Sequence, residues 1–186
     1  EGRLWFSDFY AHEVIAVDMA GQRETIVKVP GQPSGLGWTP EGRLLVVSMT
    51  DRRLLRLDPD GLVEVADLSA LANYHCNDMV VDGDGGAYVG NFGFNSHDGS
   101  EFKAADLIRV DPDGGVSVAA EGLAFPNGSV ITPDGDTLIV GETRGNILSA
   151  WDRAPDGGLS NRRVWANLGG GFPDGICLDA NGAIWV

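Results

Sequence analysis

The chain alternates short apolar segments with turns rich in Asp, Pro and Gly. Pairs of apolar segments flank such turns, as in GLGWTPEGRLLVVS from Gly35 and GSVITPDGDTLIVG from Gly128. Short segments of alternating or continuous apolar residues, bounded by these turn residues, are typical of β-strands joined in hairpins. The pattern therefore predicts an all-β protein.

The same unit recurs along the chain when its copies are aligned on a turn glycine. The five glycines are spaced by 40, 43, 50 and 47 residues and are Gly2, Gly42, Gly85, Gly135 and Gly182. A period in the forties built from strands is the signature of a β-propeller blade. We expect residues 1–186 to form one partial propeller domain of roughly four to five blades, truncated at both ends.

The third repeat contains an insertion. The distance from the turn glycine to the Asp that ends the third strand is 16 residues in the first two repeats, 17 in the fourth and 26 in the third. The extra residues lie within FGFNSHDGSEFKAA, residues 92–105. Long loops on a rigid scaffold are frequent places for ligand contacts, so this loop is a candidate part of a binding site.

A polar residue stands eight positions before each turn glycine after the first. These residues are Ser34, Asn77, Asn127 and Asp174, in the tripeptides PSG, CND, PNG and PDG. Each tripeptide alone is an ordinary turn signal. Their shared register, however, predicts that the four side chains converge at one end of a central channel. Amide and carboxylate oxygens suit a hard cation, and the absence of His and Cys from this register argues against zinc or copper.

Charge and hydropathy narrow the range of partners. The chain has 13 Lys and Arg against 27 Asp and Glu, a net charge of −14, which disfavours nucleic acid and anionic membranes. No apolar run approaches the roughly eighteen residues of a membrane span. We expect a cytoplasmic protein, and a removed secretion signal stays open as an alternative. The sequence does not indicate an oligomeric state.

Several segments carry a family resemblance. CNDMVVD, FPNGSVITPDG and FPDGICLDANGAIWV, with PSGLGW upstream and GNFGF between, resemble the SMP-30/gluconolactonase/LRE (regucalcin-like) family of calcium-dependent lactone hydrolases. The resemblance implies a six-bladed propeller with a divalent cation in its channel, usually Ca²⁺. It also implies a small-molecule substrate, a sugar lactone or related ester.

The resemblance assigns roles to individual positions. Asn127 and Asp174 match the family's metal-binding Asn and Asp, Asp174 also matches the proposed catalytic residue, and Asn77 matches an Asn between metal and substrate. The remaining metal ligand is a Glu expected upstream of residue 1 and distinct from Glu1. His75 stands where sugar-lactone members carry Arg. His75 and Asn95, the latter in the inserted loop, are further candidates for substrate binding.

These roles imply a mechanism with alternatives. A bound Ca²⁺ would polarise the lactone carbonyl while Asp174 orients or deprotonates the attacking water. Zn²⁺, Mg²⁺ and Mn²⁺ stay open as the cation. The alternative functions are a phosphotriesterase or arylesterase on the same propeller, and a non-catalytic, metal-stabilised binding module.

Overall fold

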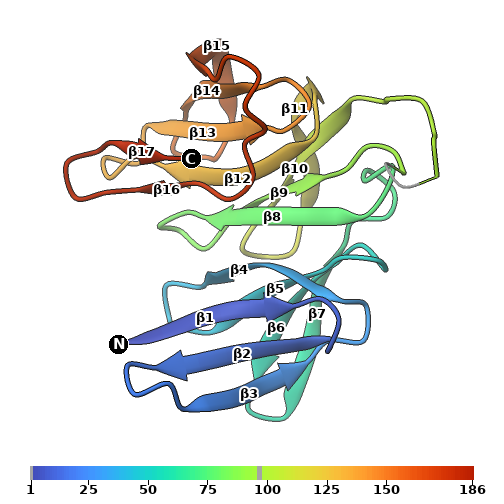
Figure 1. The fold of residues 1–186 in the computed structure, drawn as a ribbon, viewed down its shortest axis with the longest axis vertical. Helices are drawn as coiled ribbons and strands as arrows, with labels where there is room; N and C mark the ends of the chain where they lie inside the picture. The colour runs from blue at the N-terminus through green and yellow to red at the C-terminus, as the bar shows by residue number, and fades with distance from the viewer. Residues whose placement is uncertain (1, 96–97) are drawn as a thin grey trace.

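The computed structural model describes residues 2–95 and 98–186, which form five antiparallel sheets arranged in sequence order (Figure 1). The first sheet holds β1 (Arg3–Asp8), β2 (Glu13–Asp18) and β3 (Arg23–Lys28). The second holds β4 (Pro33–Trp38), β5 (Leu44–Ser48), β6 (Arg53–Asp58) and β7 (Gly61–Asp67). The third holds β8 (Cys76–Val81), β9 (Ala87–Asn91), β10 (Ala105–Val110) and β11 (Val116–Leu123).

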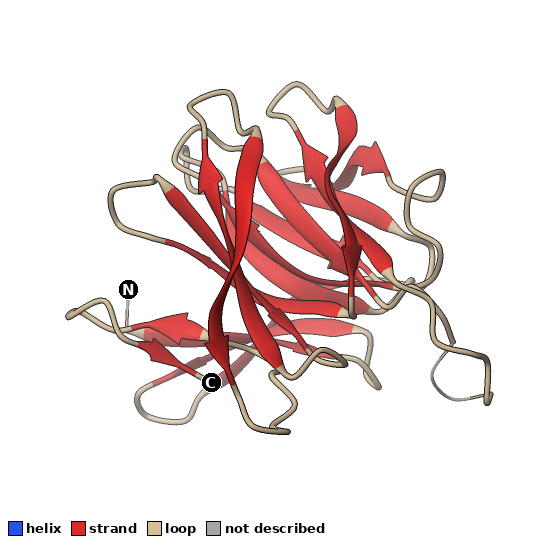
Figure 2. Cartoon of the chain, turned by 90° about the horizontal axis from the view of Figure 1, so that it is seen from above, coloured by secondary structure: helices blue, strands red, loops and turns tan. Residues whose placement is uncertain are grey.

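The fourth sheet holds β12 (Pro126–Ile131), β13 (Thr137–Glu142), β14 (Ile147–Arg153) and β15 (Leu159–Asn167), and the fifth holds β16 (Cys177–Leu178) and β17 (Ile184–Trp185). The described residues thus contain three four-stranded blades and two partial ones. The predicted all-β propeller architecture is confirmed. Figure 2 shows strands and loops throughout the described part of the chain and no helix. Accordingly, no helix among these residues is long and apolar enough to cross a membrane.

Four of the repeated glycines lie in the turns between paired strands, and Gly2 directly precedes β1. All five adopt a left-handed backbone, with φ of 70°, 81°, 89°, 82° and 80° for Gly2, Gly42, Gly85, Gly135 and Gly182. Glycine reaches this region without the steric cost that a Cβ atom brings. The predicted insertion is also present, because residues 92–104 join β9 to β10 whereas the equivalent strands β5 and β6 are joined by residues 49–52.

The first strands of successive blades lie close together because glycines occupy their contacts. A Cβ atom at Gly35 would lie 2.6 Å from Met79 N, and one at Gly128 would lie 2.4 Å from Ile176 N. Gly128 N donates a hydrogen bond of 2.9 Å to Asp174 O, which links β12 to the segment that leads into β16. The glycines that follow Ser34 and Asn127 therefore let neighbouring inner strands bring the polar register side chains together.

The apolar core lies between successive sheets. One cluster joins the second and third sheets and includes Val47, Leu54, Val89 and Ile108. Another, around the fully buried Tyr88, joins the third and fourth sheets. Burial of these side chains between blades is the main force that holds the sheets against one another.

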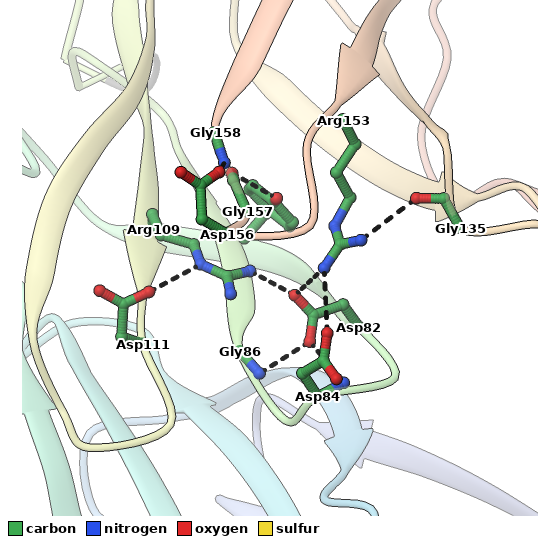
Figure 3. Close-up of polar contacts among 11 residues, drawn as sticks. Asp82, Asp84, Gly86, Arg109, Asp111, Gly135, Arg153, Asp156, Gly157 and Gly158 are labelled. Carbon is green, nitrogen blue, oxygen red and sulfur yellow. Dashed lines mark hydrogen bonds and ion pairs between the residues drawn. The ribbon is translucent and has the colours of Figure 1, made fainter.

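A buried ionic cluster also joins the third and fourth sheets, between Asp82 in the turn after β8, Arg109 in β10 and Arg153 at the end of β14 (Figure 3). Asp82 Oδ2 accepts hydrogen bonds from Arg109 Nη1 at 2.6 Å and from Arg153 Nη2 at 2.7 Å. Its Oδ1 accepts the backbone N–H groups of Asp84 and Gly86. The side chains of Asp82, Arg109 and Arg153 are 1%, 7% and 8% exposed. We call these three residues the Asp82 cluster.

Candidate functional site

One cavity of about 630 Å³ gathers the four register residues. Ser34, Asn77, Asn127 and Asp174 all line it, each contributed by the beginning of a different inner strand or by the residues before it. Ser34, Asn77 and Asn127 are buried, and Asp174 is exposed. The predicted convergence of these side chains is therefore observed. We call this space the channel cavity.

A hydroxyl group fixes the orientation of the Asn127 amide. Thr143 Oγ1 donates to Pro173 O at 2.7 Å, so its proton is used, and it accepts a hydrogen bond from Asn127 Nδ2 at 3.1 Å. Because a hydroxyl that has donated its proton offers only lone pairs, the group facing it must be the NH₂ end of the amide. The Oδ1 end of Asn127 is left for a cation or another donor.

Asn77 is held by a short chain of hydroxyl groups. Ser7 Oγ donates to Ser34 O at 2.6 Å, and Ser34 Oγ donates to Asn77 Oδ1 at 3.4 Å. These contacts link β1, β4 and β8 around the channel cavity. The second contact is long, so it constrains the Asn77 amide only loosely.

Two carboxyl groups share the channel cavity. Asp78, the neighbour of Asn77, lines it together with Asp174. Burial, and then the negative charge of Asp174, raise the pKa of Asp78 to about 6. In the described part of the chain, no Lys, Arg or His forms an ion pair with either carboxyl group. A cation between them would relieve both the desolvation and the repulsion.

The donor set of the channel cavity fits a hard divalent cation. Asn77, Asn127, Asp78 and Asp174 offer only oxygen, the ligand atom of Ca²⁺ and Mg²⁺. Residues 2–95 and 98–186 contain no group of three or more His, Cys, Asp and Glu arranged to hold a metal. A cation held by the described side chains would therefore draw on amide oxygens as well, which favours Ca²⁺, Mg²⁺ or Mn²⁺ over Zn²⁺.

Three residues considered in the sequence lie elsewhere. His75 stacks on Tyr74 with ring centroids 4.1 Å apart, beside Phe92 but outside the lining of the channel cavity. Asn95, in the loop between β9 and β10, donates from Nδ2 to Asp98 at 2.9 Å and is likewise not a lining residue. Glu1 lies outside the described residues.

The sequence interpretation missed Asp78 and Thr143. The sequence did distinguish Asp78, because the tripeptide CND carries Asp at the position where PSG, PNG and PDG carry Gly. A carboxylate at a position that three other blades keep as glycine marks this blade as different, and the register shift between Cys76 and Met79 accompanies the presence of both Asn77 and Asp78 at the channel cavity. Thr143 had no comparable signal, since its role depends on a contact with Asn127 sixteen residues earlier.

Fold and site together define the class of protein: a β-propeller whose inner strands bring amide and carboxylate oxygens to one cavity. The chain belongs to the SMP-30/gluconolactonase/LRE-like family, whose family model matches residues 1–186. The resemblance noted in the sequence motifs is thereby confirmed.

Known relatives share this family. A gluconolactonase of Zymomonas mobilis is 25% identical over 99% of this chain and 57% of its own length. The pentonolactonase XacC of Haloferax volcanii is 28% identical over 59% of this chain and 36% of its own length. The chain thus spans little more than half the length of the gluconolactonase that it matches.

Solved structures agree with this fold. The gluconolactonase XC5397 of Xanthomonas campestris superposes with a TM-score of 0.82 and 27% identity, over 98% of this chain and 65% of that one. A calcium-binding regucalcin of Agrobacterium tumefaciens superposes with a TM-score of 0.83 and 24% identity, over 99% of this chain and 62% of that one. The second match supports the fold alone.

Proposed function

We propose that this chain carries the metal site and part of the substrate cavity of a divalent-cation-dependent hydrolase that opens lactone rings. The observation that carries the proposal is the convergence of Asn77, Asn127 and Asp174, with Asp78, on one cavity. The names of the gluconolactonase and pentonolactonase relatives support the lactone as substrate.

Asn127 and Asp174 are the proposed cation ligands, and Asp78 adds a second carboxylate to the same cavity. When bound, a cation such as Ca²⁺ supplies Lewis-acid polarisation of the ester carbonyl. Because Asn77 and Asn127 are neutral, the described residues contribute only two carboxylates to the donor set. The hydrogen bond to Thr143 orients the Asn127 amide before substrate arrives.

Asp174 is the proposed general base. It is exposed at the channel cavity, so water reaches its carboxylate. There it orients the attacking water and accepts its proton as the ring ester opens. Asn77 donates from its amide to the bound substrate, while its carbonyl oxygen, which Ser34 Oγ contacts at 3.4 Å, keeps a lone pair for the cation.

The first test is metal dependence, measured on the protein as its gene encodes it. Hydrolysis of glucono-1,5-lactone and of dihydrocoumarin is followed before and after treatment with a chelator. We expect chelation to abolish hydrolysis and added Ca²⁺ to restore it. Hydrolysis that survives complete removal of divalent cations would contradict the proposal. A phosphotriester hydrolysed in preference to every lactone would instead establish the alternative hydrolase.

A second prediction concerns the orientation of Asn127. Thr143→Val removes the hydroxyl that holds Asn127 Nδ2 and Pro173 O while keeping the volume of the side chain. Changes in groups that orient metal ligands typically cost 10–100-fold in metal affinity or activity. We therefore expect Ca²⁺ affinity, measured by titration calorimetry, to fall by at least about tenfold.

Two control variants accompany this experiment. Thr143→Ser keeps the hydroxyl and should restore most of the affinity. Thr50→Val loses a comparable hydrogen bond, from Thr50 Oγ1 to Gly31 O, away from the channel cavity, and should leave Ca²⁺ affinity unchanged. Equal affinities in Thr143→Val and wild type would show that Thr143 does not orient Asn127.

A further inference from the structure

Aromatic side chains form much of the remaining wall of the channel cavity. Six of them line it, namely Trp5, Phe6, Phe9, Phe92, Phe125 and Phe172. No Lys, Arg or His is among the described lining residues. The described part of the wall therefore offers flat apolar surface and no positive charge.

The polar lining groups are largely committed to one another. Ser7 Oγ donates to Ser34 O, and Ser34 Oγ donates to Asn77. Thr143 binds Asn127 and Pro173 O. A polyhydroxylated sugar lactone needs several free donors and acceptors, since each buried hydroxyl without a partner weakens binding. The described residues leave few such groups beyond those of the proposed metal site.

Phe92 and Phe125 are stacked. Their ring centroids are 4.5 Å apart and their planes are inclined by 23°. Phe92 also lies 6.1 Å from His75, which stacks in turn on Tyr74. These contacts pack the two Phe rings against aromatic neighbours, which lowers the entropy cost of ordering them when a flat group binds.

Phe125 occupies its place despite an unfavourable backbone conformation. Its φ is +65°, a left-handed value that costs free energy for a bulky residue. The conformation is held by Thr143 N donating to Phe125 O and by the Glu142 carboxylate, which accepts Ala124 N.

The equivalent residue of the second blade shows that the backbone does not demand an aromatic side chain there. Gln32, also directly before the Pro of its tripeptide, has the same φ of +65°. The Phe side chain at 125 is thus not required by the turn, and its ring faces the channel cavity.

We propose that Phe92 and Phe125 form an aromatic platform that binds the planar, uncharged part of the substrate. The preferred substrates are then lactones or esters that carry an aromatic ring, in place of polyhydroxylated aldonolactones. The inference rests on the proposed function, because the platform lies beside the proposed metal site. The ring stacks on the platform and thereby places the ester carbonyl among Asn77, Asn127 and Asp174.

The test compares two lactones in the protein as its gene encodes it, loaded with Ca²⁺. We expect kcat/KM for dihydrocoumarin to exceed that for glucono-1,5-lactone. In Phe125→Gln, which copies the residue of the second blade, the ratio of the two values should fall about tenfold. Phe125→Tyr should restore the ratio, and Phe102→Gln, the same change outside the channel cavity, should leave it unaltered. A ratio unchanged in Phe125→Gln, or a wild-type preference for gluconolactone, would overturn the platform.

A binding experiment separates this inference from the proposed function. 2-Tetralone, the carbocyclic analogue of dihydrocoumarin, has no ester bond to hydrolyse. If the platform exists, calorimetry will detect its binding to wild type and about tenfold weaker binding to Phe125→Gln, even if neither lactone is hydrolysed. If lactones are hydrolysed in a metal-dependent way but 2-tetralone binds both proteins equally, the proposed function stands and the platform is wrong.

Discussion

Replacing Asp174 with Asn is expected to lower kcat/KM for lactone hydrolysis by a factor on the order of 10³, because general-base groups typically contribute 10²–10⁴-fold. The substitution removes a charge from the proposed metal site and a proton acceptor from the attacking water. It keeps the size of the side chain. The backbone should stay in place as well, because Gly128 N bonds to the carbonyl of residue 174 and not to its side chain.

A matched variant shows whether the loss of activity is specific to Asp174 or follows from removing any acidic side chain. Asp113→Asn makes the same change in an exposed turn, where the side-chain oxygen accepts Gly115 N and an Asn oxygen can do the same. Its activity and its circular dichroism spectrum should match wild type. If Asp174→Asn hydrolyses lactones within about twofold of wild type, Asp174 is not the base.

Replacing Asp82 with Asn is expected to cost about 3–5 kcal/mol of unfolding free energy, the range for breaking a buried ion pair from one side. Asn keeps an oxygen for the N–H groups of Asp84 and Gly86. It leaves the charges of Arg109 and Arg153 buried without their shared partner (Figure 3). Urea denaturation of wild type and variant measures the difference.

The control for this variant lies two residues away. The Asp84 side chain is 75% exposed and lies 3.8 Å from Arg153, so Asp84→Asn should change the unfolding free energy by less than about 1 kcal/mol. If both variants lose a similar amount of unfolding free energy, the burial of the Asp82 cluster does not determine how much it stabilises the fold.

The dependence of stability on pH provides a second test of the Asp82 cluster. Burial alone would raise the pKa of Asp82, but hydrogen bonds from Arg109 and Arg153 hold it below the ordinary value. A carboxyl group with a lowered pKa in the folded state stabilises the fold above its unfolded pKa of about 4, and this contribution disappears as pH falls further. Between about pH 5 and 3, the stability of wild type should therefore fall more steeply than that of Asp82→Asn.

Features repeated along the chain were predictable from the sequence. The strand pairs follow from apolar segments on either side of a turn glycine, and the left-handed φ of Gly42 and Gly135 confirms that register. The convergence of Asn77 and Asn127 follows from the same register, because equivalent residues of a radial repeat point to one channel. A repeat fixes equivalent positions without any knowledge of tertiary contacts.

Features that occur once and join distant segments were not predictable. The Asp82 cluster brings together residues separated by 27 and 71 positions, and nothing in the motif that contains Asp82 indicates which arginines it contacts. The stacking of Phe92 on Phe125 likewise depends on the packing of two blades. Asn95 belongs to an insertion absent from the other repeats, so no register could place its side chain relative to the channel cavity.

Titration of the metal-free protein with Ca²⁺ by isothermal calorimetry, in wild type and in Asp174→Asn, tests the cation site most directly. Because the experiment measures binding, it does not depend on knowing the substrate. The account predicts one Ca²⁺ bound per wild-type chain and binding at least about tenfold weaker in the variant, since a charged ligand is lost from the donor set. Equal affinity and stoichiometry in both proteins would contradict a cation site built on Asn127 and Asp174.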